Sequence, residues 1–186
     1  MIAFDIDDTV IDTYTVARQC MIDDFNYDIH PRLKHNNYVP GVKYEEMVIF
    51  IQKVLSESND KLLVYKDADK ALFKIQDLIK SDIYFITARD DHLKEVTEDL
   101  LNMRFPGLKY KLVLSTKTEK AALLDKFNLK YMVEDRLWIA NNCTNAEKVF
   151  LVKQDWNQGR PINDNVIPVD NLMEIYNYLV GVYNET

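Results

Sequence analysis

The stretch Met1-Ile-Ala-Phe-Asp5-Ile-Asp-Asp-Thr9-Val10 places a short apolar run directly before three carboxylates. Apolar runs of this length that stop at polar residues are typical of buried strands in a parallel sheet. The same pattern recurs at 82–86 before Thr87, at 131–133 before Glu134 and Asp135, and at 149–152. Residues 110–114 form a shorter candidate strand, and 166–167 could add a strand at the edge of the sheet.

Amphipathic stretches separate these runs and predict helices. Residues 66–80 carry apolar side chains at i, i+3, i+4 and i+7, which is the spacing of one helix face. Similar stretches occupy 91–104, 118–127 and 170–183. Strands that alternate with helices form right-handed βαβ units, so we expect an α/β fold with a parallel sheet covered on both faces.

Residues 12–60 break this alternation. They contain two helical patterns, at 15–27 and 44–58, with a polar stretch between them. We interpret 12–60 as a small helical cap inserted after the first strand. The remaining residues, 1–11 and 61–186, then form the core, and the chain should re-enter the core at 56–60.

The bulk composition narrows the classes of partner. The chain has 186 residues with a formal charge of -7, and so a long nucleic acid is not expected to bind. A small phosphorylated substrate remains compatible with this charge, because a metal and a few cations can reverse it locally. Cys20 and Cys143 do not suggest a disulfide framework, and no apolar run approaches the roughly 20 residues that span a bilayer. A cytoplasmic location is therefore expected, with no membrane partner.

Polar residues follow three of the predicted strands, and the carboxyl ends of parallel strands meet at one edge of a sheet. Asp5 and Asp135 would repel each other there unless a cation lay between them. Mg²⁺ suits a site made of a few carboxylates, a backbone carbonyl and substrate phosphate. We expect Asp5, Asp135 and the carbonyl of Asp7 to bind it, with Glu134 acting through water.

These groups are competent for phosphoryl transfer, which depends mainly on positioning and on neutralising charge. Asp5 could attack phosphorus as a carboxylate nucleophile, and Asp7 could protonate the leaving oxygen and then deprotonate water. The hydroxyl of Thr87 and the backbone amides after it could bind the phosphate oxygens. A lysine could balance the phosphate charge.

Four motifs in this order resemble those of the haloacid dehalogenase-like superfamily. They are Asp5-Ile-Asp-Asp-Thr9-Val10, Ile86-Thr87-Ala-Arg89, Lys120, and Val133-Glu134-Asp135-Arg136. The resemblance covers nearly the whole chain outside 12–60. It implies a Rossmann-like three-layer α/β/α core, Mg²⁺, an aspartyl-phosphate on Asp5 and a cap between the first two motifs. It also favours Lys120 over Lys117 as the phosphate lysine.

Within that superfamily the chain looks most like the C-type 5'-nucleotidases, also called 5'(3')-deoxyribonucleotidases. The resemblance rests on the small helical cap, the Ile-Thr-Ala-Arg motif and the tail Phe150-Leu-Val-Lys-Gln-Asp-Trp-Asn157. Glu134 departs from it, since the nucleotidases usually have Asp there. The resemblance implies nucleoside 5'-monophosphates as substrates.

Other functions remain open on the same core. They are a sugar-phosphate phosphatase, a phosphatase of nucleic-acid ends, a phosphotransferase or mutase, and a non-catalytic binding protein. Arg89 and Arg136 are expected in structural ion pairs, with contact to phosphate or substrate as the alternative for each. Five aromatic side chains could pack in a core or stack on a base: Phe25, Tyr27, Tyr38, Phe50 and Trp156.

Overall fold

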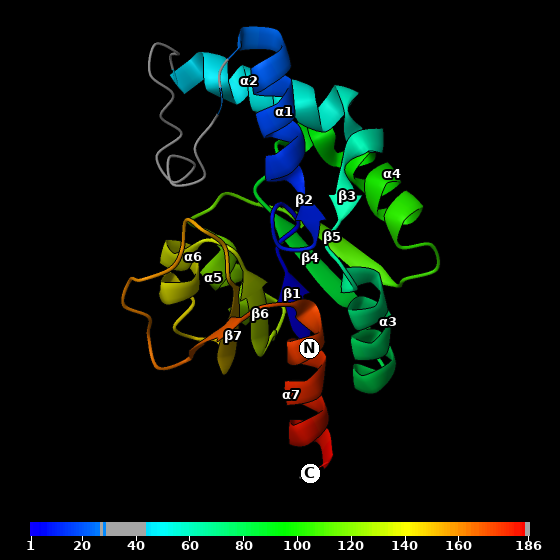
Figure 1. Ribbon diagram of the computed structural model, residues 1–186. Coiled ribbons are helices and arrows are strands. Elements are labelled where there is room, and N and C mark those ends of the chain that lie inside the picture. Colours follow the sequence, from blue (N-terminus) through cyan, green and yellow to red (C-terminus); the bar gives the residue numbers. More distant parts are fainter. Residues whose placement is uncertain (27, 29–43, 185–186) are drawn as a thin grey trace.

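A computed structural model describes residues 1–26, 28 and 44–184, and six parallel strands form its main sheet (Figure 1). The strand order is β5-β4-β1-β6-β7-β8. Their bounds are β1 Ile2–Phe4, β4 Ile83–Thr87, β5 Tyr110–Leu114, β6 Tyr131–Glu134, β7 Lys148–Val152 and β8 Val166–Val169. The predicted parallel sheet is confirmed, and β8 lies at its edge as expected.

Strand β1 lies in the middle of the sheet, between β4 and β6. Ala3 pairs with Tyr84 on one side and with Met132 on the other. The backbone N–H of Asp5 donates to the carbonyl of Val133 at 2.9 Å, which extends the ladder by one residue beyond β1. Asp5 is therefore fixed at the carboxyl edge of the sheet, next to the ends of β4 and β6.

Helices cover both faces of the sheet, so the core has three layers. Because side chains alternate across a strand, Phe4 faces one layer and Ala3 faces the other. The layer on the Phe4 side contains α3 Ala68–Ile79, α4 Lys94–Arg104 and α7 Leu172–Asn184. The opposite layer contains α5 Lys120–Lys126 and α6 Leu137–Asn142.

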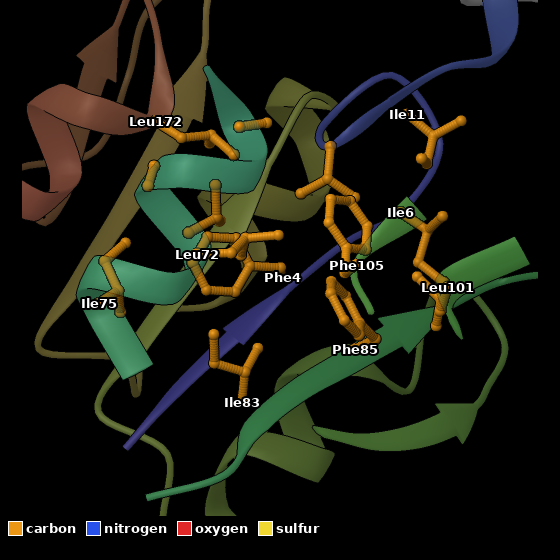
Figure 2. Close-up of a cluster of buried hydrophobic side chains, with 14 of the residues drawn as sticks. Phe4, Ile6, Ile11, Leu72, Ile75, Ile83, Phe85, Leu101, Phe105 and Leu172 are labelled. Carbon is orange, nitrogen blue, oxygen red and sulfur yellow. The ribbon is translucent and has the colours of Figure 1, made fainter. Parts of the chain in front are cut away.

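The larger apolar cluster fixes β1 against these helices (Figure 2). The ring of Phe4 lies 6.4 Å from that of Phe85, and Phe85 lies 6.2 Å from Phe105. Each such ring is buried, and full burial of a side chain of this size contributes about 1.5–3 kcal/mol. The strand end that carries Asp5 is therefore held by tight packing directly behind it.

A two-stranded antiparallel ribbon joins the core to the inserted segment. It pairs β2 Ile11–Asp12 with β3 Leu63–Val64, so the chain leaves and returns at one place. Above the ribbon lie α1 Thr13–Phe25 and α2 Tyr44–Glu57 (Figure 1), followed by the short turn η2 Asn59–Lys61. Ala17 and Met21 of α1 pack against Phe50 and Val54 of α2.

Both helices of the expected cap are therefore present, while a cap at 12–60 as a separate domain stays a prediction.

Two side chains accept hydrogen bonds from backbone N–H groups at the start of α1. Asp12 accepts a hydrogen bond from the N–H of Thr15 at 3.0 Å, and Asp8 accepts one from the N–H of Tyr14 at 2.7 Å.

No helix among residues 1–26 and 44–184 is long and apolar enough to cross a membrane.

Candidate active site

The ends of three adjacent strands bring distant residues together at the carboxyl edge of the sheet. Asp5 follows β1, Thr87 is the last residue of β4, and Glu134 ends β6 with Asp135 directly after it. The side chains of all four residues are buried. The convergence of strand ends that the sequence predicted is present in the fold.

Lys120 connects two of these carboxylates. It is the first residue of α5 and is 2 % exposed, and its Nζ lies 2.6 Å from Asp5 Oδ1 and 2.8 Å from Glu134 Oε2. The other oxygen of Glu134 accepts the backbone N–H groups of Asp135 and Arg136, each at 3.1 Å. Glu134 therefore holds Lys120 in place, and Lys120 in turn holds the side chain of Asp5.

Burial and neighbouring charges shift the titration of this cluster. Burial lowers the pKa of Lys120, but Asp5 and Glu134 outweigh it, so that the pKa lies above its ordinary value. Burial raises the pKa of Asp5, and Asp135 and Asp7 add to that effect while Lys120 opposes it. Burial also raises the pKa of Glu134 to about 8. Burial is the largest cause of the raised pKa of both carboxyl groups, and the neighbouring carboxylates add to it while Lys120 opposes it.

Asp135 is oriented by the loop that follows β7. The indole Nε1 of Trp156 donates to Asp135 Oδ2 at 2.9 Å. The side-chain amide of Asn157 donates at 2.7 Å both to the carbonyl of Asp135 and to that of Val152. Trp156 and Asn157 therefore hold the carboxylate and the backbone of Asp135 in place.

The donor set fits a hard divalent cation. Asp5, Glu134 and Asp135 are buried, and one carboxylate oxygen of each lies within 4.8 Å of the others. Three acidic groups against one lysine leave a local excess of negative charge that a divalent cation would neutralise. Coordination by Asp5, Asp135 and the carbonyl of Asp7, with Glu134 acting through water, stays a prediction.

Asp7 is held by donors from two other elements. Arg89 Nε lies 3.1 Å from Asp7 Oδ2, and Arg89 Nη2 lies 2.8 Å from Asp7 Oδ1. The hydroxyl of Thr13, the first residue of α1, donates to Asp7 Oδ1 at 2.5 Å. The expected ion pair of Arg89 is confirmed, and its partner is the residue predicted as acid and base.

Thr87 presents its hydroxyl at the end of β4. Its Oγ1 accepts the backbone N–H of Arg89 at 3.3 Å, and its carbonyl accepts the N–H of Ser115 at 2.9 Å from the end of the neighbouring strand. Since Thr87 Oγ1 acts as the acceptor in this contact, its hydroxyl proton is available for donation to another acceptor. A phosphate contact of Thr87 and of Lys120 stays a prediction.

Lys117 lies at the border of the same site. It is partly exposed, in the loop before α5. Burial lowers its pKa, and the nearby charges of Arg136 and Lys120 lower it further. Lys120 makes the contacts to Asp5 and Glu134, which agrees with the preference for Lys120 over Lys117.

The guanidinium of Arg136 forms no ion pair within residues 1–26, 28 and 44–184, so the expectation for Arg136 was wrong for that part of the chain.

Of the aromatic residues considered for stacking on a base, one packs in the core and another lies at the candidate site. Phe50 is buried between α1 and α2, and it is a core residue. Trp156 packs against Tyr14 with 5.4 Å between ring centroids. Both border a cavity of about 260 Å³, which Tyr65 also lines. The side chains of Phe25, Tyr27 and Tyr38 lie outside the part of the chain that the structure describes.

Two contributions to the site were missed by sequence reasoning. Asn157 had no assigned role, although it makes two short hydrogen bonds at Asp135 and at the end of β7. The Trp156 contact to Asp135 was missed as well, because the residue was considered only for stacking. Two signals in the sequence pointed to them: their place just after a buried strand, at the edge where the acidic residues meet, and their presence in the tail 150–157 that resembles the nucleotidases.

Comparison with known proteins identifies the fold. No family model matches the chain, and no curated protein matches it either. Among solved structures, a haloacid dehalogenase-like hydrolase from Streptococcus pneumoniae matches with a TM-score of 0.66 at 11% identity, over 96% of this chain and 97% of that one. A protein assigned as a β-phosphoglucomutase from Thermotoga maritima gives 0.60 at 13%, covering 97% and 98%.

A protein assigned as a phosphoglycolate phosphatase from Lactobacillus plantarum matches with a TM-score of 0.61 at 13% identity, over 95% of this chain and 97% of that one. These matches extend over the core and the inserted helices alike. With its six-stranded parallel sheet and helices on both faces, the chain has the fold of the haloacid dehalogenase-like hydrolases.

Proposed function

We propose that the chain is a Mg²⁺-dependent phosphatase that hydrolyses small phosphate monoesters through an aspartyl-phosphate on Asp5. The observation that carries this proposal is the buried group of Asp5, Lys120, Glu134 and Asp135 at the sheet edge. A buried carboxylate beside a lysine and two further acids costs stability. Such a cost is expected where the groups act on a charged ligand.

Asp5 and Asp135 would bind the metal directly, and Glu134 would stabilise Lys120 and act on the ion through water. Bound Mg²⁺ would supply positive charge to the phosphate oxygens. The rest of the chemistry comes from side chains of this chain. Lys120 lies 2.6 Å from Asp5 Oδ1, so a phosphate placed for attack by Asp5 lies within reach of its ammonium group.

The first step breaks the bond between phosphorus and the leaving oxygen and forms a bond between phosphorus and an Asp5 oxygen. Asp7 enters this step in its protonated form and gives its proton to the leaving oxygen, which departs as an alcohol. In the second step Asp7 takes a proton from water, the water oxygen bonds to phosphorus, and the bond to Asp5 breaks. Inorganic phosphate leaves, and both aspartates return to their starting forms.

For the leaving group we propose a nucleoside, so that nucleoside 5'-monophosphates are the preferred substrates. The cavity of about 260 Å³ beside Trp156 supports this preference, because Tyr14, Tyr65 and Trp156 line it together with six polar side chains, and a nucleoside offers both a ring face and polar groups. The resemblance of residues 150–157 to the nucleotidase tail agrees with it. The acidic chain disfavours nucleic-acid ends as substrates.

A second candidate is a phosphatase or mutase acting on a small sugar or acid phosphate. The similar structures assigned as a β-phosphoglucomutase and a phosphoglycolate phosphatase favour it. Both candidates use the same Asp5 chemistry and differ in the acceptor or in the leaving group.

A screen of phosphate monoesters tests the proposal. Ribo- and deoxyribonucleoside monophosphates, sugar phosphates and phosphoglycolate are incubated with Mg²⁺, and free phosphate is measured without any added acceptor. We expect release from at least one nucleotide, loss of release with chelator, and none from Asp5→Asn. Release only from sugar or acid phosphates would favour the second candidate, and transfer that needs an added acceptor would favour a mutase. No release from any monoester would refute the phosphatase.

A further inference from the structure

Arg89 is an unusual residue in this site because it is a buried arginine that contacts no part of the nucleophile cluster directly. It lies in the loop after β4, and its side chain is 1% exposed. Its guanidinium forms a two-point ion pair with Asp7, at 3.1 Å through Nε and 2.8 Å through Nη2. The planar fork of arginine matches a carboxylate in this geometry, so the pair fixes the plane of the Asp7 carboxyl group.

The arginine is itself fixed at its other end. Arg89 Nη1 donates to Thr97 Oγ1 at 3.2 Å, and Thr97 in α4 donates in turn to the carbonyl of Leu93 at 2.7 Å. On the far side of Asp7, Thr13 donates to Oδ1 at 2.5 Å. A continuous chain of hydrogen bonds therefore runs from α4 through Arg89 and Asp7 to the first residue of α1.

These contacts argue against a direct role in binding phosphate. Three of the five guanidinium N–H groups of Arg89, one on each nitrogen, donate to acceptors within the protein. Lys120 instead lies against Asp5, where a phosphate under attack must sit. Any effect of Arg89 on the reaction should therefore pass through Asp7.

We propose that Arg89 is a positioning residue, which holds the carboxyl group of Asp7 at the place where it exchanges a proton with the leaving group. This inference rests on the proposed function, in which Asp7 is the acid and base. A second contact ties Arg89 to the same site, because its backbone N–H donates to Thr87 Oγ1 at 3.3 Å. One residue thus orients the acid through its side chain and the Thr87 hydroxyl through its backbone.

The proposal predicts a dependence on the leaving group. The leaving group of an alkyl phosphate is a strongly basic alkoxide unless it is protonated. The leaving group of p-nitrophenyl phosphate is a stable phenolate, which departs without a proton. General acid catalysis contributes about 10²- to 10⁴-fold. A defect in the position of Asp7 should therefore lower kcat/KM, which reports the first step, strongly for an alkyl phosphate and weakly for the aryl phosphate. The second step is common to both substrates, so a loss of Asp7 as base lowers kcat for both.

The experiment compares Arg89→Lys, Arg89→Gln, Asp7→Asn and the double variant Asp7→Asn/Arg89→Gln on both substrates. We expect Arg89→Gln to lower kcat/KM for the alkyl phosphate by about 10²-fold or more, and the double variant to be no slower than Asp7→Asn alone. Thr97→Val, which removes only the outer anchor, should show the same bias at a smaller size. Arg160→Gln is the matched control, because Arg160 is exposed and far from β4 in sequence.

Three outcomes would overturn the inference. Equal losses of kcat/KM on the two substrates would assign Arg89 a merely structural role. A rise in KM with kcat unchanged would make it a substrate-binding residue. Fully additive losses in the double variant would show that Arg89 does not act through Asp7. If the wild-type chain released no phosphate from either ester, the proposed function would fail, and the positioning role would fall with it.

Urea unfolding of the wild type, Arg89→Gln, Asp7→Asn and the double variant needs no turnover and tests whether the pair exists in solution. We expect the two single changes to be non-additive in the unfolding equilibrium by at least tenfold, because the double variant leaves no charge unpaired. Additive changes would show that Asp7 and Arg89 are not paired, which would also overturn the proposal.

Discussion

Replacing Lys120 with methionine separates the structural and the chemical roles of the buried charges. Methionine has nearly the length of lysine and keeps most of its contacts, but it removes the ammonium group that lies 2.6 Å from Asp5 and 2.8 Å from Glu134. The side chain of Lys120 is 2% exposed, and that of Glu134 is fully buried. Water therefore cannot solvate the carboxyl groups that lose the ammonium group.

The cost of this change can be estimated from the contacts. Removal of one partner from a buried ion pair destabilises a protein by about 3–5 kcal/mol. For a chain of this size about 1 kcal/mol corresponds to roughly 2–4 °C in Tm, so the variant should melt about 6–20 °C lower. Replacing Glu134 with glutamine in the same chain removes one of the two carboxyl groups that lose their partner, while Asp5 remains. The variant Lys120→Met/Glu134→Gln should therefore recover part of the lost Tm.

Activity should behave differently from stability. The double variant still lacks the cation that would neutralise the phosphate, so its phosphate release should stay at least about 10²-fold below wild type. Thermal unfolding and phosphate release on the three variants and the wild type are the two measurements. If the losses in Tm of Lys120→Met and Glu134→Gln simply added, or if activity returned together with stability, the reasoning would be refuted.

The remaining predictions concern the metal end of the site and its titration. Asn157→Ala removes two hydrogen bonds of 2.7 Å and a third, from the backbone N–H of Gln154 to Asn157 Oδ1 at 3.1 Å, and should cost about 1–3 kcal/mol in urea unfolding. An unchanged midpoint would contradict the role of Asn157 in holding Asp135. Trp156→Phe keeps the ring but loses the donor to Asp135, and Mg²⁺ affinity measured by calorimetry should fall about 10- to 100-fold. Burial, with Asp5 and Asp135 adding to it, raises the pKa of Glu134 in the folded chain to about 8, so the folded chain holds a proton that the unfolded chain has released. The stability that this proton contributes is complete below the ordinary pKa of 4.5 and is lost as the pH rises to about 8. With chelator present, Tm should fall over that window in wild type and fall less in Glu134→Gln; a flat Tm in wild type would contradict the shift.

The sheet could be predicted from sequence because its signal is local. Each strand is a short apolar run with a polar residue at its end, and burial on both faces demands that pattern. The last residue of each strand was predicted less accurately. Strand β4 extends to Thr87 and β6 to Glu134, one residue beyond each predicted run, since backbone pairing continues after the apolar side chains stop.

Helix α6 and the pairing of β2 with β3 were not predicted. Residues Leu137–Asn142 are too short for a helical period to be visible, and the two-residue strands of the ribbon have no alternation of their own. Their existence depends on contacts between distant parts of the chain. Sequence reasoning therefore located the insertion but not the ribbon that joins it to the core.

The candidate site divides in the same way. Asp5, Thr87 and Asp135 follow strands, so the topology alone brings them together. The contact between Arg89 and Asp7 joins residues 82 positions apart through long side chains, whose direction no local pattern determines. The same holds for Trp156 and Asp135, which are 21 positions apart.

The most direct test of the account is the covalent state of Asp5 during turnover. The chain is mixed with Mg²⁺ and an active monoester, quenched in acid, digested and analysed by mass spectrometry. The account predicts a peptide carrying one phosphoryl group at Asp5, absent with chelator, and in greater amount in Asp7→Asn if that variant still forms the ester and hydrolyses it slowly. Rapid hydrolysis with no phosphoryl group on Asp5 at any quench time, or undiminished turnover by Asp5→Asn, would contradict it.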